Sequence, residues 1–345
     1  MRGVLWSFLF LVSQLGFSQI GGDHIYEFLN ISSSARVSAL GGNQIAVKDD
    51  DVFLGFVNPS LLNSEMDNKF AFTYTSYLED IGAGFVSYTK DFDSLGTFSF
   101  GVQYIDYGDF VETDNGGNEI GNFTAGEYAF VIGYAYQIDS NFSVGANLKT
   151  IHSSFYDQTS NGLALDAGLT YFSEKNGLTV ALLVKNAGFQ LSKYDNAQES
   201  EDLPFEVQLG ATKRFANVPL RLGLIVHQIQ DWDLTYENPN IQQTQSLFGE
   251  DSNQDDDDGF MENLSRHLIL NAEFLVSKNF NIRLGYNFLR RAELKIEDKL
   301  GAIGFSWGFG MRISKFHLSY GRSSFHQSGA TNTFSVSTRF SDFIN

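Results

Sequence analysis

The stretch Ile303-Gly304-Phe305-Ser306-Trp307-Gly308-Phe309-Gly310-Met311-Arg312 alternates large apolar residues with glycine, serine and arginine. Successive side chains of a β-strand point to opposite faces of the sheet. One face of this segment is therefore apolar, and the other carries small or polar residues. This pattern predicts a strand that lies between two different environments.

The same period of two recurs from Lys69 to the end of the chain, which contains 33 glycines and 33 phenylalanines but only 4 prolines. Roughly fourteen segments show it, each near the length that a tilted membrane strand needs. They span residues 68–76, 81–90, 95–107, 124–137, 140–154, 160–173, 177–188, 205–215, 219–235, 265–277, 279–290, 301–313, 315–323 and 331–340.

The connections between these segments alternate in length. Every other one is short: residues 91–94, 138–139, 173–176 and 216–217, then Lys278 and Ser314 alone. Bacterial outer-membrane barrels have short periplasmic turns and longer outer loops. The pattern therefore predicts an all-β fold, a transmembrane antiparallel β-barrel of about fourteen strands in the bacterial outer membrane. An even strand number places both termini in the periplasm.

A secreted β-sandwich or propeller would also show alternation. Sandwich strands usually have about 5–6 residues, which is much shorter than these segments. No repeat of propeller-blade length is visible in the sequence. A closed barrel also suits lipid, where no backbone group can remain unpaired. These arguments favour the membrane barrel.

The first residues predict an export signal. A positive charge at Arg2 precedes an apolar run from Val4 to Val12, and small residues follow at Gly16 and Ser18. The alternative, a membrane anchor, needs about 20 apolar residues. We therefore expect a signal peptide over residues 1–18, an N-terminal segment over residues 19–66 and the barrel over residues 67–345.

The N-terminal segment lacks the period of a long strand. It contains Gly41-Gly42, the acidic run Asp49-Asp50-Asp51 and Asn58-Pro59, where the proline could open a short helix. The glycines on the inner barrel face leave space in the lumen. We expect this segment to fill the lumen as a plug, or hatch; an open pore is the competing interpretation.

Composition and motifs argue against an enzyme and against nucleic-acid binding. The formal net charge is −18, whereas a phosphate backbone must be met by Lys and Arg. Residues 304–308 match G-x-S-x-G, but they lie within an alternating strand, not at a strand-to-helix turn. The six histidines are scattered along the chain. We expect no catalytic residue and no cofactor.

One acidic stretch carries a weak metal hypothesis. Asp251, Asn253, Asp255 and Asp257 supply oxygen ligands of the kind calcium prefers. Their spacing departs from the usual calcium loop, because Gly259 comes one residue late. A solvated acidic loop is the favoured interpretation, and bound calcium is the alternative.

Several segments together resemble a known family. They are Gly22-Asp23-His24-Ile25-Tyr26-Glu27-Phe28-Leu29-Asn30, Ala35-Arg36-Val37-Ser38-Ala39-Leu40-Gly41-Gly42, Asn58-Pro59-Ser60-Leu61-Leu62, Phe123-Thr124-Ala125-Gly126-Glu127-Tyr128 and Trp232-Asp233-Leu234-Thr235-Tyr236. The full set resembles the PorQ family of the type IX secretion system. The Ala-Arg and Asn-Pro elements are also similar to the wider FadL-like and PorV-like barrels. Residues 255–258 depart from the family pattern.

The resemblance implies a FadL-like barrel of fourteen strands. Its structural hatch motif would comprise Ala35, Arg36, Gly41, Gly42, Asn58 and Pro59. The implied role is a non-enzymatic membrane anchor for the cell-surface attachment complex, with PorZ, PorU and PorV as partners beside the outer-membrane lipid. Residues 107–123, 188–203 and 237–264 would be the binding loops. The alternative is a FadL-like channel for hydrophobic small molecules, with the hatch as its gate.

Overall fold

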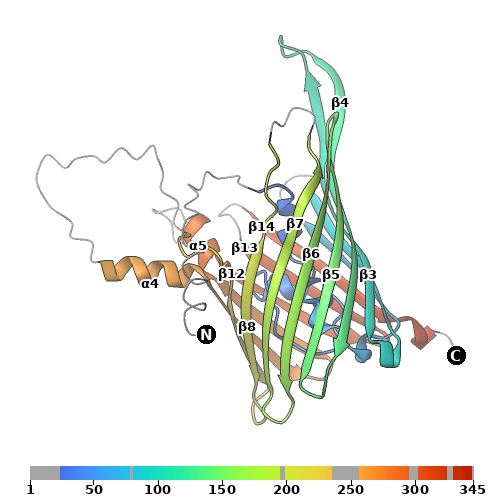
Figure 1. The fold of residues 1–345 in the computed structure, drawn as a ribbon, viewed down its shortest axis with the longest axis vertical. Coiled ribbons are helices and arrows are strands. Elements are labelled where there is room, and N and C mark those ends of the chain that lie inside the picture. Colours follow the sequence, from blue (N-terminus) through green and yellow to red (C-terminus); the bar gives the residue numbers. More distant parts are fainter. Residues whose placement is uncertain are drawn as a thin grey trace, which may run out of the picture.

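The computed structural model describes residues 24–77, 81–194, 199–234, 256–294, 302–324 and 329–343. These residues form a closed antiparallel barrel in which each strand pairs with its sequence neighbours and β1 pairs with β14 (Figure 1). The predicted fourteen-stranded barrel is confirmed. The predicted signal peptide, residues 1–18, lies outside the described residues.

The strand bounds follow the alternating segments closely. They are β1 (Lys69–Ser76), β2 (Gly82–Asp91), β3 (Thr97–Thr113), β4 (Glu119–Gln137), β5 (Phe142–Phe155), β6 (Gln158–Ser173), β7 (Leu178–Ser192), β8 (Glu206–Arg214), β9 (Leu220–Val226), β10 (Leu268–Ser277), β11 (Phe280–Asn287), β12 (Phe305–Ile313), β13 (Phe316–Ser324) and β14 (Ala330–Arg339). The short connections gather at one end, which we call the turn end. The opposite end is the loop end.

The predicted loop 107–123 is largely strand, and the predicted loop 188–203 begins with the last residues of a strand, so the predicted bounds of both loops were wrong. Residues 107–123 form the tip of a hairpin in which β3 and β4 continue past the other strands (Figure 1). The pairing shifts register between Asp106 and Asp109, next to Gly108 at φ 86°, and this bulge hides the continuity from a strict period of two. Likewise β7 continues to Ser192 beyond a bend at Asn186 (φ 55°).

The predicted strand over residues 219–235 extends too far at its C-terminal end. Strand β9 stops at Val226, and Gln228 adopts a left-handed φ of 52°. Within the predicted binding loop 237–264, the described part is the first portion of helix α4 (Asp256–Arg266). A second helix, α5 (Phe288–Leu294), follows β11, while the short helices η4 (Asp93–Leu95) and η5 (Phe340–Phe343) lie in the first turn and after β14.

The two faces of the barrel differ as the sequence predicts. Outward side chains such as Phe130 (57% exposed), Trp307 (45%) and Phe334 (53%) remain uncovered by protein. Their inward neighbours, including Thr73 and Asn147, are buried. An apolar outer band with a polar interior is the arrangement of a barrel in a membrane. Among the helices in the described ranges, none has both the length and the apolar character to cross a membrane.

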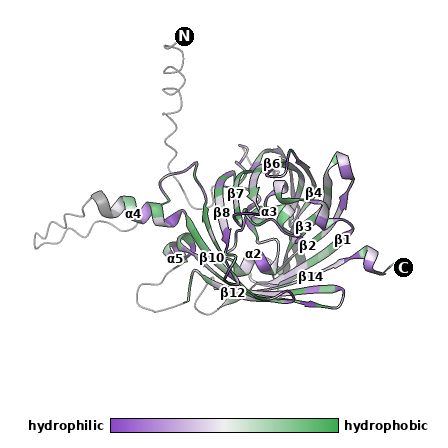
Figure 2. Cartoon of the chain, turned by 90° about the horizontal axis from the view of Figure 1, so that it is seen from below, coloured by the Kyte–Doolittle hydropathy of each residue, from purple (hydrophilic) through white to green (hydrophobic). Residues whose placement is uncertain are grey.

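The N-terminal segment occupies the lumen as the predicted hatch. It contains η1 (Glu27–Asn30), α2 (Ala35–Ala39), α3 (Leu54–Val57), η2 (Pro59–Leu61) and η3 (Ser64–Met66). Figure 2, looking into the barrel, shows α2 and α3 inside the ring of strands. Helix α2 packs against β11 to β14, while η2 packs against β4, β5 and β6.

Inward glycines allow the hatch backbone to touch the wall. A Cβ added at Gly145 would lie 2.5 Å from the Pro59 carbonyl carbon, and one at Gly321 would lie 2.2 Å from the Ala35 carbonyl oxygen. A Cβ at Gly285 would lie 2.2 Å from the Gly41 nitrogen. Larger residues at these positions would push the hatch away. These inner-face glycines therefore lie where the hatch backbone comes closest to the barrel wall.

Replacing Gly145 by leucine should loosen the hatch while the barrel remains folded. Overpacking a filled interior costs about 1–3 kcal/mol, and here the hatch backbone is the part that must move. We expect trypsin to cleave after Arg36 and Lys48 faster in the Gly145→Leu protein than in the wild type, in non-denaturing detergent.

The matched control is Gly121→Leu. Gly121 lies in β4 near the hairpin tip, where an added Cβ would meet only the Glu112 carboxylate, at 3.2 Å. Equal cleavage rates in the two variants would show that Gly145 does not seat the hatch.

Candidate functional site

The first part of the hatch motif builds a capped helical turn. The Ser34 hydroxyl accepts a hydrogen bond from the Val37 amide at 3.2 Å, which caps the start of α2. The Ala35 amide donates to the Ser335 hydroxyl of β14 at 2.8 Å. At the other end Gly41 and Gly42 adopt φ +95° and +94°, which disfavours any residue with a side chain. The motif thus fixes α2 against the wall.

The second part of the motif builds another short helix. The Asn58 side chain accepts a hydrogen bond from the Ser60 amide at 3.1 Å and donates to the Ile45 carbonyl at 2.8 Å. Pro59 is the first residue of η2, as the sequence predicts. A Cβ at Gly168 of β6 would lie 2.1 Å from the Asn58 side-chain oxygen. Asn58 therefore joins two hatch segments and sets them against the wall.

Arg36 is the centre of a buried ion-pair cluster that ties α2 to the barrel. Its guanidinium donates to both oxygens of Glu273 in β10, at 2.8 and 2.9 Å. It also pairs with Asp49 at 2.8 Å and Asp51 at 3.3 Å in the hatch. Arg221 of β9 lies 2.6 Å from Glu273. The cluster therefore joins two hatch segments to two neighbouring strands.

Electrostatics keep Arg36 and Asp49 of the hatch ionised. Burial disfavours the charged form of Arg36, but Asp49 and Glu273 outweigh it and raise the pKa of Arg36 well above its usual value. Burial similarly opposes ionisation of Asp49, while Arg36 and then Arg221 lower the pKa of Asp49 below its usual range. A buried charge without its partner is costly. The hatch therefore cannot leave without breaking several ion pairs at once.

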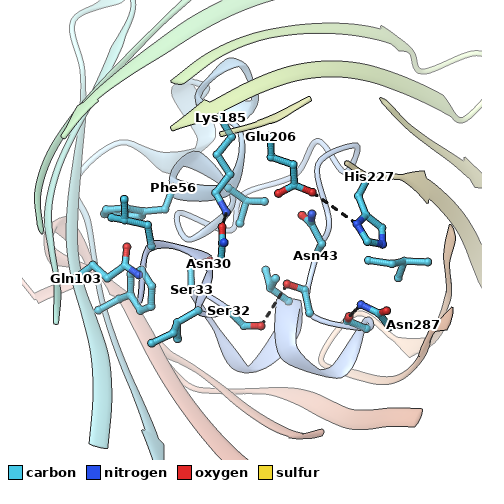
Figure 3. Close-up of a pocket in the computed structure, with 18 of the residues that line it drawn as sticks. Asn30, Ser32, Ser33, Asn43, Phe56, Gln103, Lys185, Glu206, His227 and Asn287 are labelled. Atoms are coloured by element: carbon cyan, nitrogen blue, oxygen red, sulfur yellow. Dashed lines mark hydrogen bonds and ion pairs between the residues drawn. The ribbon is translucent and has the colours of Figure 1, made fainter. Parts of the chain in front are cut away.

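A polar cavity of about 190 Å³ lies between the hatch and the wall on the loop-end side (Figure 3). The Lys185 ammonium reaches across it to the Asn30 side-chain oxygen at 3.0 Å. His227 lies 3.6 Å from Glu206, which is the register partner of Lys185 on the neighbouring strand β8. Burial lowers the pKa of His227, although Glu206 opposes this effect. The cavity is thus bounded by mixed polar groups.

Helix α2 separates this cavity from a second one. Val37 lines the loop-end cavity, whereas Arg36 lines a pocket of about 320 Å³ on the turn-end side. The partition between the two is the hatch itself, held by the Arg36 cluster. Passage through the lumen would therefore require α2 to move.

A third pocket, of about 400 Å³, lies at the loop end and is lined largely by apolar side chains. The hatch contributes Glu27, Phe28 and Ile31. The wall contributes Tyr77, Ile81, Ile105, Tyr107, Ala330 and Thr331 from around β1, β2, β3 and β14. Burial raises the pKa of Tyr77 to about 12, so its phenol stays neutral at physiological pH. We call this the rim pocket. Ile31 lines both the rim pocket and the polar cavity.

The remaining candidate sites are the G-x-S-x-G serine and the acidic stretch of the calcium hypothesis. Ser306, the central serine of the G-x-S-x-G match, lies within β12 and hydrogen-bonds Ser323 at 3.1 Å. Asp251, Asn253 and Asp255 lie outside the described residues, and the Asp257 side chain is likewise not described. The calcium hypothesis stays a prediction. No group of three His, Asp or Glu side chains in the described ranges is arranged to hold a metal ion.

The sequence motif identified Arg36 but missed its partners. Glu273, Arg221 and Arg283 lie on strands far along the chain, and only barrel closure brings them to the hatch. Each falls at an inward position of its strand. Large charged residues at inward positions were therefore the available signal. The rim pocket gave no such signal, because its apolar residues come from segments that meet only in the closed barrel.

Neither a protein-family model nor a curated protein matches the sequence. The fold, however, is similar to solved barrels. The toluene transporter TodX of Pseudomonas putida has a TM-score of 0.52 at 11% identity, over 90% of this chain and 98% of that chain. The monoaromatic hydrocarbon channel CymD has a TM-score of 0.51 at 12% identity, over 92% and 99%. The chain shares the barrel fold of these two proteins. The PorQ family is not among these matches.

Replacing Arg36 by alanine should weaken hatch attachment strongly. The change leaves Asp49 and Glu273 buried with one cation fewer, and breaking a buried pair from one side costs about 3–5 kcal/mol. We expect faster amide hydrogen exchange over residues 35–57 in the Arg36→Ala protein, while exchange of the barrel strands stays slow.

Lys90→Ala serves as the comparison. Lys90 pairs with Asp67 at 2.9 Å, but both side chains are about one-third exposed. Such a pair contributes about 0–1 kcal/mol. If the rate of amide hydrogen exchange in the hatch rises equally in Arg36→Ala and Lys90→Ala, Arg36 does not have the role assigned to it.

Proposed function

We propose that the protein is an outer-membrane channel for hydrophobic small molecules, with the rim pocket as its binding site and the hatch as its gate. The observation that carries this proposal is the pocket itself. Ligand pockets typically enclose about 300–1,000 Å³ and are mostly apolar with few polar groups. A cavity of about 400 Å³ lined by Phe28, Ile31, Ile81 and Ile105 fits that description.

The position of the pocket suits capture from outside the cell. The short turns of outer-membrane barrels face the periplasm, which would place the loop end, and the rim pocket with it, at the cell surface. A ligand leaving the pocket past Ile31 would enter the polar cavity, since Ile31 borders both. Its further passage would require the Arg36 cluster to open. The similar folds of TodX and CymD, described as a toluene transporter and a monoaromatic hydrocarbon channel, are consistent with such a cargo.

Filling the rim pocket tests the proposal. Thr331 lies at an inward, buried position near the start of β14 and lines the pocket, so an indole at this position would occupy the space of a ligand. We expect a photoreactive phenyldiazirine to label Tyr77 and Tyr107 in the wild type, and this labelling to fall to background in Thr331→Trp. Uptake of radiolabelled toluene by cells producing Thr331→Trp should match that of cells lacking the protein.

Two controls accompany the experiment. Labelling of the outward Trp307 region reports lipid-phase probe and should not change. Val276→Trp adds an indole at an exposed position of β10, outside the pocket, and should leave labelling and uptake as in the wild type. Equal labelling of Tyr77 and Tyr107 in wild type and Thr331→Trp would contradict the proposal.

The β3–β4 hairpin favours a second candidate function, a surface anchor. Beyond Asp109 and Thr124 the two strands remain paired past the rest of the barrel (Figure 1). Val111 and Ile120 near its tip are 54% and 60% exposed. Exposed apolar residues on a projecting element can hold a partner protein. Together with the PorQ resemblance, this makes PorZ, with PorU and PorV, the proposed partner complex.

The two functions respond to different substitutions. If the hairpin is an anchor, PorZ should co-purify with the wild type and be lost from a Val111→Asp/Ile120→Asp double variant, because a buried unpaired carboxylate is costly at an interface. Val218→Asp, at an exposed position of a turn at the opposite end, should retain PorZ. If PorZ binds the wild type, the double variant and Val218→Asp equally, or binds none of them, the hairpin is not the anchor.

A further inference from the structure

The turn-end pocket has an unusual charge for this chain. Eight Lys and Arg side chains line it: Arg36, Lys69, Arg221, Lys278, Arg283, Arg312, Lys315 and Arg339. Five carboxylates line it as well: Asp49, Asp50, Asp51, Glu273 and Asp342. The pocket wall therefore carries an excess of three positive charges (8 − 5), whereas the whole chain carries −18. Basic residues are concentrated here against the overall composition.

The carboxylates form ion pairs with only some of these cations. Arg36, Arg221 and Arg283 all pair with Glu273, and the first two also reach Asp49. Lys69 pairs with Asp50. These contacts lie toward the hatch, at the inner end of the pocket. The deeper half is thus neutralised within the protein.

Four cations at the outer half have only one carboxylate among them, Asp342, so an excess of three positive charges (4 − 1) remains there. Arg339 donates to the Glu65 backbone carbonyl at 2.7 Å, and Lys315 donates to the Asp342 backbone carbonyl. Lys278, in the β10–β11 turn, and Arg312, at the end of β12, line the same pocket. None of the four forms an ion pair with a carboxylate within the described part of the chain. Like charges around one cavity of about 320 Å³ repel each other unless an anion lies between them.

We propose that this pocket binds a phosphate group. Arg and Lys side chains recognise phosphate through charge-assisted hydrogen bonds, and Arg can do so with two parallel bonds. A phosphate monoester carries about −1.5 to −2 charge at neutral pH and three acceptor oxygens, which matches several cations better than one carboxylate would. The group could belong to a soluble phosphate ester or to an anionic lipid headgroup. The site is distinct from the rim pocket, because α2 and the Arg36 cluster separate them.

The test uses the full mature chain in uncharged detergent. Calorimetric titration with inorganic phosphate and with glycerol 3-phosphate measures the soluble ligands. Native mass spectrometry after reconstitution with phosphatidylglycerol or phosphatidylcholine measures the lipid headgroup. We expect the double variant Lys278→Gln/Arg312→Gln to bind about tenfold more weakly or worse, because two charge-assisted bonds are lost. Both side chains are exposed near strand ends, so the barrel should still fold.

The matched control is Lys175→Gln/Arg214→Gln. It removes the same charge at the same end of the barrel, but both residues line a different surface pocket. Binding of the soluble phosphates that is lost only in the first double variant supports a soluble ligand. Selective retention of phosphatidylglycerol that is lost only in that variant supports a headgroup. Phosphate binding that is absent, or equal in both double variants, overturns the proposal, as does binding of an acidic peptide where no phosphate binds.

Discussion

The structure depends on one constraint: within hydrocarbon, every backbone amide and carbonyl must find a partner in the chain itself. Closure of β1 onto β14 meets this requirement in the described part of the ring, because each strand then pairs with a neighbour on both sides. Closure also sorts the side chains, because alternate residues must face lipid or lumen. The apolar outer band and the polar inner face are two results of the same ring.

The polar groups of the enclosed interior also need hydrogen-bond and ion-pair partners, and the hatch supplies them. Inward glycines such as Gly145 and Gly285 admit the hatch backbone, and inward charges such as Glu273 meet Arg36. The cluster around Arg36 gains its strength from burial, because each ion would be costly without the others. The same cluster divides the lumen into a loop-end and a turn-end compartment.

Much of this fold follows from local sequence. Alternation locates the strands to within a few residues wherever the ladder is regular, as in β12 and β5. It fails where a bulge or a left-handed residue interrupts the period, as at Gly108, Asn186 and Gln228, because such a residue shifts the inward and outward faces. The hatch motif is visible in the sequence, and Pro59 begins a short helix as expected.

The site is less accessible from sequence, since it depends on contacts across the barrel. Arg36 meets Glu273, which lies 237 positions later in the chain. The rim pocket joins hatch residues to both ends of the barrel sequence, near β1 and β14. Neither relation follows from a period of two. Closure with a known strand order would have been needed to place these residues together.

The most direct test of the account asks whether the outer face contacts lipid. Trp307 lies on β12 with its side chain 45% exposed and pointing outward. In a variant with Trp6 and Trp232 replaced by phenylalanine, its fluorescence in vesicles reports its surroundings alone. We expect strong quenching by lipids with brominated acyl chains and little quenching by aqueous iodide. Quenching by iodide without quenching by brominated chains would contradict the membrane barrel.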